Sequence, residues 1–316
     1  MTGVTVDFSA GLSVGVQLPT VDGFGIGFAD FLPMAQLAEE LGFDSVWVGD
    51  HLSFRAPVLE SFVALGMAAA VTTRVGLGTG VLIPPLRQPV WTAKQISSLQ
   101  AASGNRVIIG AGVGGEFPGE WEAVGVSRSE RGLRMESFLT ALPEMLSGRH
   151  VKLGAPWNCE VPPLTPFGAM PPVWIGGRKD IALRRAVRHR AGWIGVWHDA
   201  STLTARRDRL VEFAAAEDVA RPPMALQVLV HPTTAADQGH AEMQAFMEKI
   251  YGIPYRDVQR FCVGGDESAL AEKLGSLVAV GLDSIVLIPA VRDQISALPA
   301  LARVAQALRN QGGTPA

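Results

Sequence analysis

The segment RVGLGTGVLIPPLRQPVWTAKQISSLQAASGNRVIIGAGVGG, residues 74–115, decides the fold of this chain. An apolar run is followed by a helical stretch and a second apolar run, and both apolar runs lead into glycine-rich turns. Continuous apolar runs are typical of parallel strands that are covered on both faces. Glycines at the ends of such strands mark places where another group approaches the main chain. The segment therefore predicts a buried βαβ unit with a ligand near its turns.

Apolar runs and helical stretches alternate in the same way along the rest of the chain. Eight such units fit a (β/α)8 TIM barrel better than an open sheet. The chain has 316 residues, of which 48% are hydrophobic, and this size suits a single barrel domain over residues 1–316. The strands are expected at residues 12–18, 45–48, 75–83, 107–109, 173–175, 193–197, 224–231 and 284–288.

Two segments interrupt the alternation, residues 148–172 and residues 232–265. The first is rich in proline, and the second holds an extra helical stretch. Long excursions at the C-terminal ends of barrel strands form lids and pocket walls. We expect both segments to lie toward this catalytic rim.

The composition excludes several classes of partner. The formal net charge is −3 and no run of Lys or Arg occurs, so nucleic acid is not expected and a small molecule is the default ligand. Cys159 and Cys262 lie far apart without a CxxC motif, which argues against a metal site or a disulfide and for buried thiols. The N-terminal residues lack the pattern of a signal peptide, and no apolar run is long enough to span a bilayer. We expect a cytoplasmic protein.

An acid and an imidazole, Asp50 and His51, emerge together where the second expected strand ends. The C-terminal ends of the strands form the catalytic face of a barrel. Histidine exchanges protons near neutral pH, and a neighbouring carboxylate can orient it. The pair is either catalytic or a loop histidine beside a capping aspartate, and we favour catalysis.

The third strand ends with Gly80 and Val81, just before two prolines. Gly78 and Gly80 either leave room for a ligand ring or allow a close strand approach inside a tapered barrel. The spacing alone favours neither interpretation.

The fourth strand leads into GAGVGGEFPGEW, which contains GxGxxG at residues 110–115. A dinucleotide-binding fingerprint should open directly into a helix and be followed by an acidic residue that ends the next strand. Here the residues after the motif interrupt any helix, and no such strand follows. We therefore reject a Rossmann site and interpret Glu116 as a carboxylate at the rim.

The best candidate for a phosphate site is the turn in PPVWIGGRKDIALRRAV. A strand ends at Gly176 and Gly177, Arg178 follows, and a helix begins near Asp180. Backbone NH groups at a helix N-terminus, with an arginine beside them, bind anions. The alternative is an ordinary turn between a strand and a helix.

Taken in their order along the chain, these motifs resemble the bacterial luciferase-like flavin-dependent oxidoreductases. The likeness runs from GVQLPT through AEELGFDSVWVGDHL and PPVWIGGRKDIALRRA to ALAEKLGSLVAVGLDSIVLIPA. Within the superfamily it is greatest to the enzymes that use coenzyme F420, a 5-deazaflavin carrier of hydride. Ala191 and Phe54 depart from the residues that many members have at these positions, so the substrate pocket cannot be carried over.

The resemblance implies a role for each candidate residue. A non-prolyl cis peptide is expected between Gly80 and Val81, behind the ring of the cofactor. His51 and Glu116 would exchange the proton that accompanies hydride transfer. The cofactor would be bound by Asp50 at the ring edge, by Val113 and Gly114, and at its phosphate by Gly176, Gly177 and Arg178.

The resemblance leaves the reaction class open. The preferred reaction is hydride transfer between F420 and an organic substrate that lies over the ring. One alternative is a two-component monooxygenase that uses FMNH2 from a partner reductase, and a second is a protein that binds a flavin without turnover. A homodimer is expected from the resemblance alone.

Overall fold

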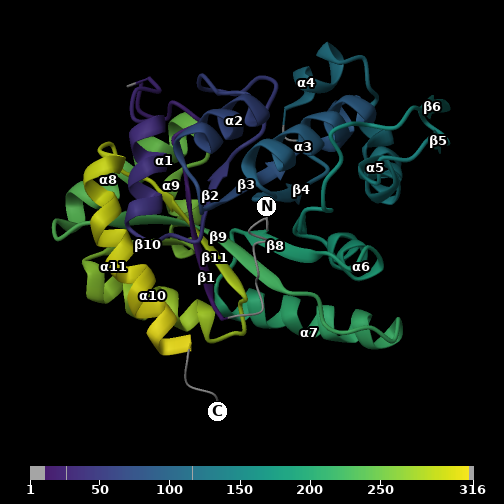
Figure 1. Cartoon of the computed structure of the whole chain (residues 1–316). Helices are drawn as coiled ribbons and strands as arrows, with labels where there is room; N and C mark the ends of the chain where they lie inside the picture. Colours follow the sequence, from purple (N-terminus) through teal and green to yellow (C-terminus); the bar gives the residue numbers. More distant parts are fainter. Residues whose placement is uncertain (1–10, 26, 116, 313–316) are drawn as a thin grey trace.

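The computed structural model describes residues 11–25, 27–115 and 117–312 (Figure 1). Eight parallel strands pair side by side, and β11 pairs back with β1 to close a barrel. This closed barrel confirms the predicted TIM barrel. In order around the barrel, the strands are β1 (Ser13–Gln17), β2 (Ser45–Val48), β3 (Gly76–Leu82), β4 (Val107–Ala111), β7 (Val173–Gly176), β8 (Gly192–Val196), β9 (Met224–Pro232) and β11 (Ser284–Pro289).

Helices connect the strands and cover the outside of the barrel (Figure 1). The longer helices are α1 (Phe31–Glu40), α2 (Ser61–Val71), α3 (Pro89–Ser103), α5 (Arg131–Leu146), α6 (Asp180–Arg188), α7 (Ala200–Ala216), α8 (Ala236–Ile250), α10 (Glu267–Val278) and α11 (Gln294–Gly312). The shorter α-helices are α4 (Pro118–Ala123) and α9 (Tyr255–Val258), and the short 3-10 helices are η1 (Pro84–Leu86), η2 (Arg128–Glu130) and η3 (Gln259–Phe261).

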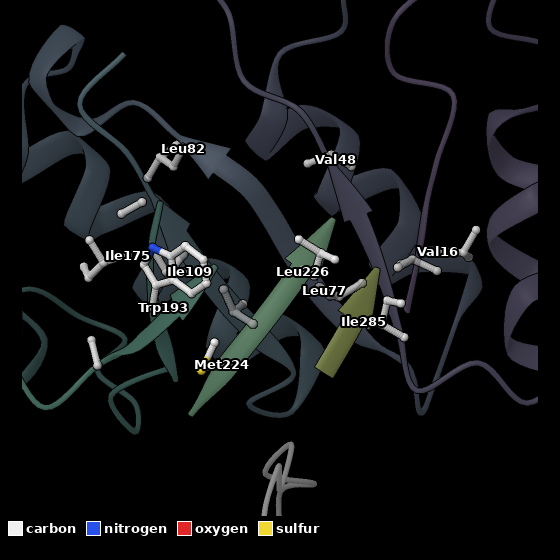
Figure 2. Close-up of a cluster of buried hydrophobic side chains, with 14 of the residues drawn as sticks. Val16, Val48, Leu77, Leu82, Ile109, Ile175, Trp193, Met224, Leu226 and Ile285 are labelled. Atoms are coloured by element: carbon white, nitrogen blue, oxygen red, sulfur yellow. The ribbon is translucent and has the colours of Figure 1, made fainter. Parts of the chain in front are cut away.

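The main core lies between the strands and the helices. Side chains alternate across a strand, so every second residue points outward from the barrel. Val16, Val48, Leu77 and Ile285 are outward-facing residues of this kind and are completely buried (Figure 2). Burial of both faces explains why the strands read as continuous apolar runs.

Two tryptophans fill the interior of the barrel. Trp47 and Trp174 are fully buried, and the glycines of neighbouring strands make room for their rings. A Cβ atom added at Gly78 would lie 2.4 Å from the Trp47 ring, and one added at Gly192 would lie 2.3 Å from the Trp174 ring. Gly78 therefore makes room for a core side chain and not for a ligand ring. For this glycine, the packing interpretation is the correct one.

The segment 148–172 does not lie at the catalytic rim, contrary to our expectation. It forms a hairpin of β5 (Val151–Leu153) and β6 (Cys159–Val161) at the outer edge of the molecule, beside α5 (Figure 1). Gln100, near the C-terminal end of α3, donates a hydrogen bond to the carbonyl of Ala169. The segment connects the end of a helix to the start of a strand, and such connections lie at the N-terminal face of a barrel.

The segment 232–265 does reach the mouth of the barrel, as predicted. It contains α8, α9 and a ninth parallel strand, β10 (Cys262–Gly265), that pairs with the C-terminal half of β9. Phe246, Ile250 and Tyr251 from this segment line the cavity at the mouth.

The composition led to expectations about membrane spans, metal sites and the two cysteines. In the part of the chain that the structure describes, no helix is long and apolar enough to cross a bilayer. The same residues hold no cluster of three or more His, Cys, Asp or Glu suited to a metal ion. Cys159 and Cys262 are free and only partly buried, so the expectation of buried thiols was wrong in degree.

The outer surface of α2 and α3 carries exposed apolar side chains. Val63 and Met67 on α2 and Trp91 on α3 are exposed to solvent, and α2 is apolar around most of its circumference. A helix of this kind is usually covered by another surface. The homodimer expected from the family resemblance stays a prediction.

The turn before β3 is held by the carboxylate of Glu39 at the end of α1. It accepts hydrogen bonds from the backbone NH groups of Thr73, Arg74 and Val75, at 2.6 to 3.0 Å. Burial alone would raise the pKa of Glu39, but these hydrogen bonds outweigh it and lower the pKa from its ordinary value of 4.5 to about 2.

We expect Glu39→Gln to lower the free energy of unfolding at neutral pH by about 2 kcal/mol. Because the pKa is depressed in the folded state, the carboxylate stabilises the fold fully above pH 4.5 and loses this effect as the pH falls toward about 2. The gap between the urea midpoints of wild type and variant should therefore shrink over that range. Glu40→Gln, at an exposed neighbour, should change little, and a gap independent of pH would contradict this account.

Candidate active site

A cavity of about 980 Å³ opens at the C-terminal ends of the barrel strands. Nine of the ten residues that the sequence singled out line this one cavity, although nearly 130 positions separate the first from the last. They are Asp50, His51, Gly80, Val81, Val113, Gly114, Gly176, Gly177 and Arg178. The tenth, Glu116, lies outside the described residues, and its role stays a prediction.

One wall of the cavity is formed by backbone at the ends of β3, β4 and β7. The peptide bond between Gly80 and Val81 is cis, as predicted. A Cβ atom added at Gly112 would lie 2.7 Å from the Val81 side chain, and one added at Gly176 would lie 3.0 Å from it. Only glycine fits at these positions without displacing Val81, so the two glycines make room for the Val81 side chain, and all three residues line the cavity.

The floor of the cavity is polar. The side-chain amide of Gln227 on β9 donates to the carbonyl oxygen of Gly80 at 3.3 Å and to the side-chain oxygen of Gln17 on β1 at 3.4 Å. A Cβ atom added at Gly80 would lie 2.5 Å from the Gln227 amide nitrogen. Gly80, unlike Gly78, therefore does face the cavity.

Positive charge gathers at one end of the cavity. Arg128 in η2, Arg131 at the start of α5, and Arg178 and Lys179 in the turn before α6 all line it. Among the residues that the structure describes, none of the four has an ion pair or a side-chain hydrogen bond. Cations without carboxylate partners at a helix N-terminus form a site for an anionic ligand.

The turn at this end is fixed by its neighbours. The indole nitrogen of Trp193 on β8 donates a hydrogen bond to the carbonyl of Gly177 at 2.9 Å. Gly177 has a φ of +149°, and a Cβ atom there would lie 2.8 Å from the Cβ of Ala182. Arg185 also lines the cavity, but it pairs with Glu136 at 2.8 Å and is not free for a ligand.

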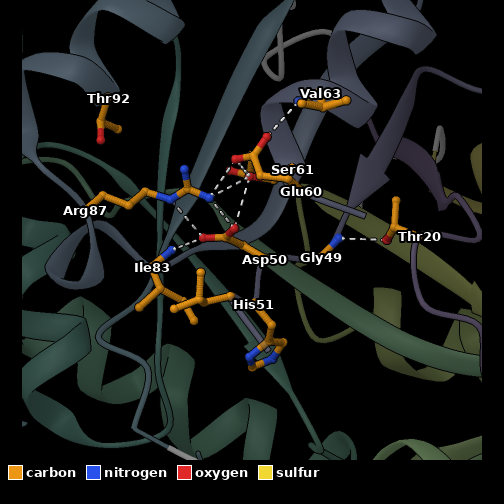
Figure 3. Close-up of polar contacts among 12 residues, drawn as sticks. Thr20, Gly49, Asp50, His51, Glu60, Ser61, Val63, Ile83, Arg87 and Thr92 are labelled. Carbon is orange, nitrogen blue, oxygen red and sulfur yellow. Dashed lines mark hydrogen bonds and ion pairs between the residues drawn. The ribbon is translucent and has the colours of Figure 1, made fainter. Parts of the chain in front are cut away.

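Asp50 is held in place by several neighbouring residues (Figure 3). One carboxylate oxygen accepts from the backbone NH of Ile83 at 2.8 Å, and the other accepts from Arg87 at 2.5 Å and from Ser61 at 3.1 Å. The pKa of Arg87 is raised although burial would lower it, because Asp50 and Glu60 flank the guanidinium. The predicted contact of Asp50 with the cofactor ring stays untested, and its visible task is to join the ends of β2 and β3.

The side chain of His51 points away from the Asp50 cluster (Figure 3). Its Nδ1 lies 3.2 Å from the carboxylate of Glu120, which is 2% exposed and also accepts from the backbone NH of Leu52 at 2.7 Å. The imidazole stacks on Phe54, with ring centroids 4.2 Å apart, and Phe117 lies against its edge. The imidazole is thus fixed by a buried carboxylate on one side and by aromatic rings on the others.

The sequence did not predict the partners of Asp50 and His51. Glu120 stands four positions after Glu116 in the sequence, in the first turn of α4, and Arg87 lies just after the two prolines that follow β3. An acidic residue in the first turn of a helix usually stabilises that helix, so its side chain gave no sign of reaching His51. The sequence also did not predict that Arg128 and Arg131 line the cavity.

The fold and the cavity define a (β/α)8 barrel whose candidate active site lies at the C-terminal mouth, where barrel enzymes have theirs. A family model described as Luciferase-like monooxygenase matches residues 9–274. An uncharacterized protein of Mycobacterium tuberculosis is 31% identical over 212 residues, which cover 59% of this chain and 73% of that protein. The F420-dependent glucose-6-phosphate dehydrogenase of Nakamurella multipartita is 31% identical over 183 residues, covering 53% of this chain and 52% of the dehydrogenase.

Among solved structures, the monooxygenase RslO1 from Streptomyces bottropensis superimposes with a TM-score of 0.82 at 18% identity. The match covers 93% of this chain and 98% of that one, and it shows that the two share a fold. The family model spans most of the chain, so the protein belongs to the luciferase-like monooxygenase family. This membership makes it an enzyme of the oxidoreductase type.

We expect Arg87→Met to destabilise the fold by about 3 kcal/mol, because it leaves the buried Asp50 carboxylate without its cation. Glu60→Gln is the matched control, since it removes the other, half-exposed partner of the same arginine and should cost less than about 1 kcal/mol. Chemical unfolding of both variants measures the difference. Equal losses would mean that the Asp50 pair does not hold the ends of β2 and β3 together.

Proposed function

We propose that this protein transfers a hydride between coenzyme F420 and a small organic substrate that lies over the deazaflavin ring. The observation that carries the proposal is the group of cations Arg128, Arg131, Arg178 and Lys179 at one end of the cavity. No carboxylate among the described residues pairs with them, so an anionic ligand would supply the missing charge. The wall of Gly80, Val81, Gly112 and Gly176 lines the same cavity, and the ring of the same ligand would lie beside it.

The number of these cations supports F420 over FMN. FMN ends in a single phosphate, whereas F420 carries a phosphodiester followed by glutamate carboxylates. The N-terminus of α6 with Arg178 can bind one phosphate group, which leaves Arg128, Arg131 and Lys179 for further carboxylates. The likeness to an F420-dependent dehydrogenase supports the same choice.

When bound, the deazaflavin would supply the hydride chemistry, and it lacks the ring nitrogen through which reduced flavin activates oxygen. The residues of this chain would bind and orient the reactants. Gly80, Gly112 and Gly176 line the cavity together with Val81, and the ring would lie beside this glycine wall. Glu120 holds Nδ1 of His51, so that Nε2 is the nitrogen that exchanges a proton with the substrate. Glu116 remains a second candidate for this exchange.

A two-component monooxygenase that takes FMNH2 from a partner reductase is the alternative. It is supported by the shared fold with the monooxygenase RslO1. A third possibility is a protein that binds a flavin without turnover, and the fixed geometry of His51 argues against it.

We expect oxidised or reduced F420 to bind the purified protein at least tenfold more tightly than FMN, as measured by fluorescence quenching. Arg131→Gln should weaken the binding of F420 by about tenfold, because it removes a charge-assisted hydrogen bond to an anionic group. Tighter binding of reduced FMN than of F420 would replace this proposal with the monooxygenase.

The control is Arg134→Gln, which lies one turn further along α5 and pairs with Glu130 outside the cavity. Its affinity for F420 should equal that of wild type. Equal weakening in both variants would mean that the effect comes from the net charge of the protein and not from a site.

We expect His51→Ala to lower the rate of turnover by a factor of about 100 or more while F420 binds with unchanged affinity, because a proton exchanger is lost. Glu120→Gln should lower the rate by about tenfold, since the imidazole is no longer held by a charge. His150→Ala, at an exposed histidine of the opposite face, is the control. Full activity of the His51 variant would remove this residue from the mechanism.

A further inference from the structure

The cavity has two chemically different ends. The four cations belong to the turns and helices that follow β4 and β7. Around the closed ring of eight strands, the strands diametrically opposite these two are β11 and β1. The cavity lining over β11, β1 and the neighbouring α8 has a different composition.

This opposite end is apolar. Its surface is made by Val21 after β1, Ile288 on β11, and Phe246 and Ile250 on α8. Among the cavity-lining residues that the structure describes, no Asp, Glu, Lys or Arg belongs to β9, β11, β1 or α8. A carboxylate or phosphate placed here would lose its hydration without gaining a partner, which is strongly unfavourable.

Three aromatic side chains stand between the two ends and frame the apolar part. Trp197, which follows β8, and Tyr251 after α8 meet edge to face with centroids 5.4 Å apart. Phe54 lies edge to face with Tyr251 at 6.3 Å and stacks on His51. Trp197 has a φ of +62°, an uncommon conformation for a bulky residue, and its side chain lines the cavity. Such a frame favours a flat ring system.

An unpaired hydrogen-bond acceptor, the side-chain oxygen of Gln294, belongs to a residue at the apolar end. The side-chain nitrogen of Gln294, at the start of α11, donates to the carbonyl of Pro289 at 3.0 Å, which fixes the orientation of the amide. Its oxygen is buried and has no hydrogen-bond partner among the described residues. Gln294 lines the cavity, and a buried acceptor without a partner costs free energy that a donor on a ligand would recover.

We infer that the substrate is an uncharged, mainly aromatic molecule that carries a hydroxyl or NH group and places this donor against Gln294. The inference rests on the proposed function in one respect, that the cofactor occupies the cationic end and the glycine wall. The apolar end then belongs to the substrate, with His51 and Phe54 at the junction of the two. Sugar phosphates and carboxylic acids are excluded by the same arrangement.

Three matched probes test the inference by calorimetric titration of the protein saturated with F420. They are indole, 1-methylindole, which lacks the NH donor, and indole-3-carboxylate, which adds a charge. We expect indole to bind about fivefold more tightly than 1-methylindole and at least tenfold more tightly than the carboxylate. A carboxylate that binds as well as indole would overturn the inference.

Gln294→Leu removes the acceptor while keeping the apolar volume, and it should abolish the preference for indole over 1-methylindole. Gln244→Leu, on the exposed side of α8, makes the same change outside the cavity and should preserve the preference. A preference that survives in the Gln294 variant would overturn the role of this residue. The wild-type series alone decides the question if the variant does not fold.

The two proposals fail in different ways. If F420 binds but the probes show no preference, only the assignment of the substrate fails. If F420 does not bind, the titrations are repeated with FMN, and the same preferences would then keep the substrate class while the hydride-transfer function falls. Displacement of F420 by indole would place the probe in the cofactor half and would overturn the inference.

Discussion

The packing of Trp47 and Trp174 inside the barrel is the constraint on which the rest of the structure depends. The two indoles occupy the space that glycines on neighbouring strands leave, and they close the interior below the mouth. The cavity can therefore begin only above them, at the level of Gln227 and Gly80. A smaller side chain at either tryptophan would leave a void in the centre of the molecule, at a cost typical of large-to-small changes in a core. The depth of the active site is thus set by core packing.

The sequence was sufficient for the barrel because strands covered on both faces carry continuous apolar runs. It failed for the segment 148–172, since a proline-rich composition indicates an excursion but not the face on which it lies. The position of the segment between a helix and a strand held that information. Gly78 and Gly80 show a further limit, because one faces a tryptophan and the other faces the cavity although their local sequences are alike.

The residues of the candidate site were predicted better than their interactions. Strand ends are visible in a sequence, so Asp50, His51 and the glycine turns could be placed at one rim. Contacts between distant residues are not visible, and the buried carboxylate of Glu120 beside His51 emerged only from the fold. The same applies to the ion pair between Arg87 and Asp50, which the sequence did not predict.

Part of the wall opposite the cations, including Phe246 and Ile250, comes from one continuous stretch of chain, residues 236–258, that is inserted between two strands of the barrel. The remaining barrel closes without it, because β9 pairs with β8 and β11 on its own. Replacement of this stretch would change the apolar end of the cavity while the cationic end stays unchanged. The substrate preference of this enzyme can therefore change through the replacement of a single segment.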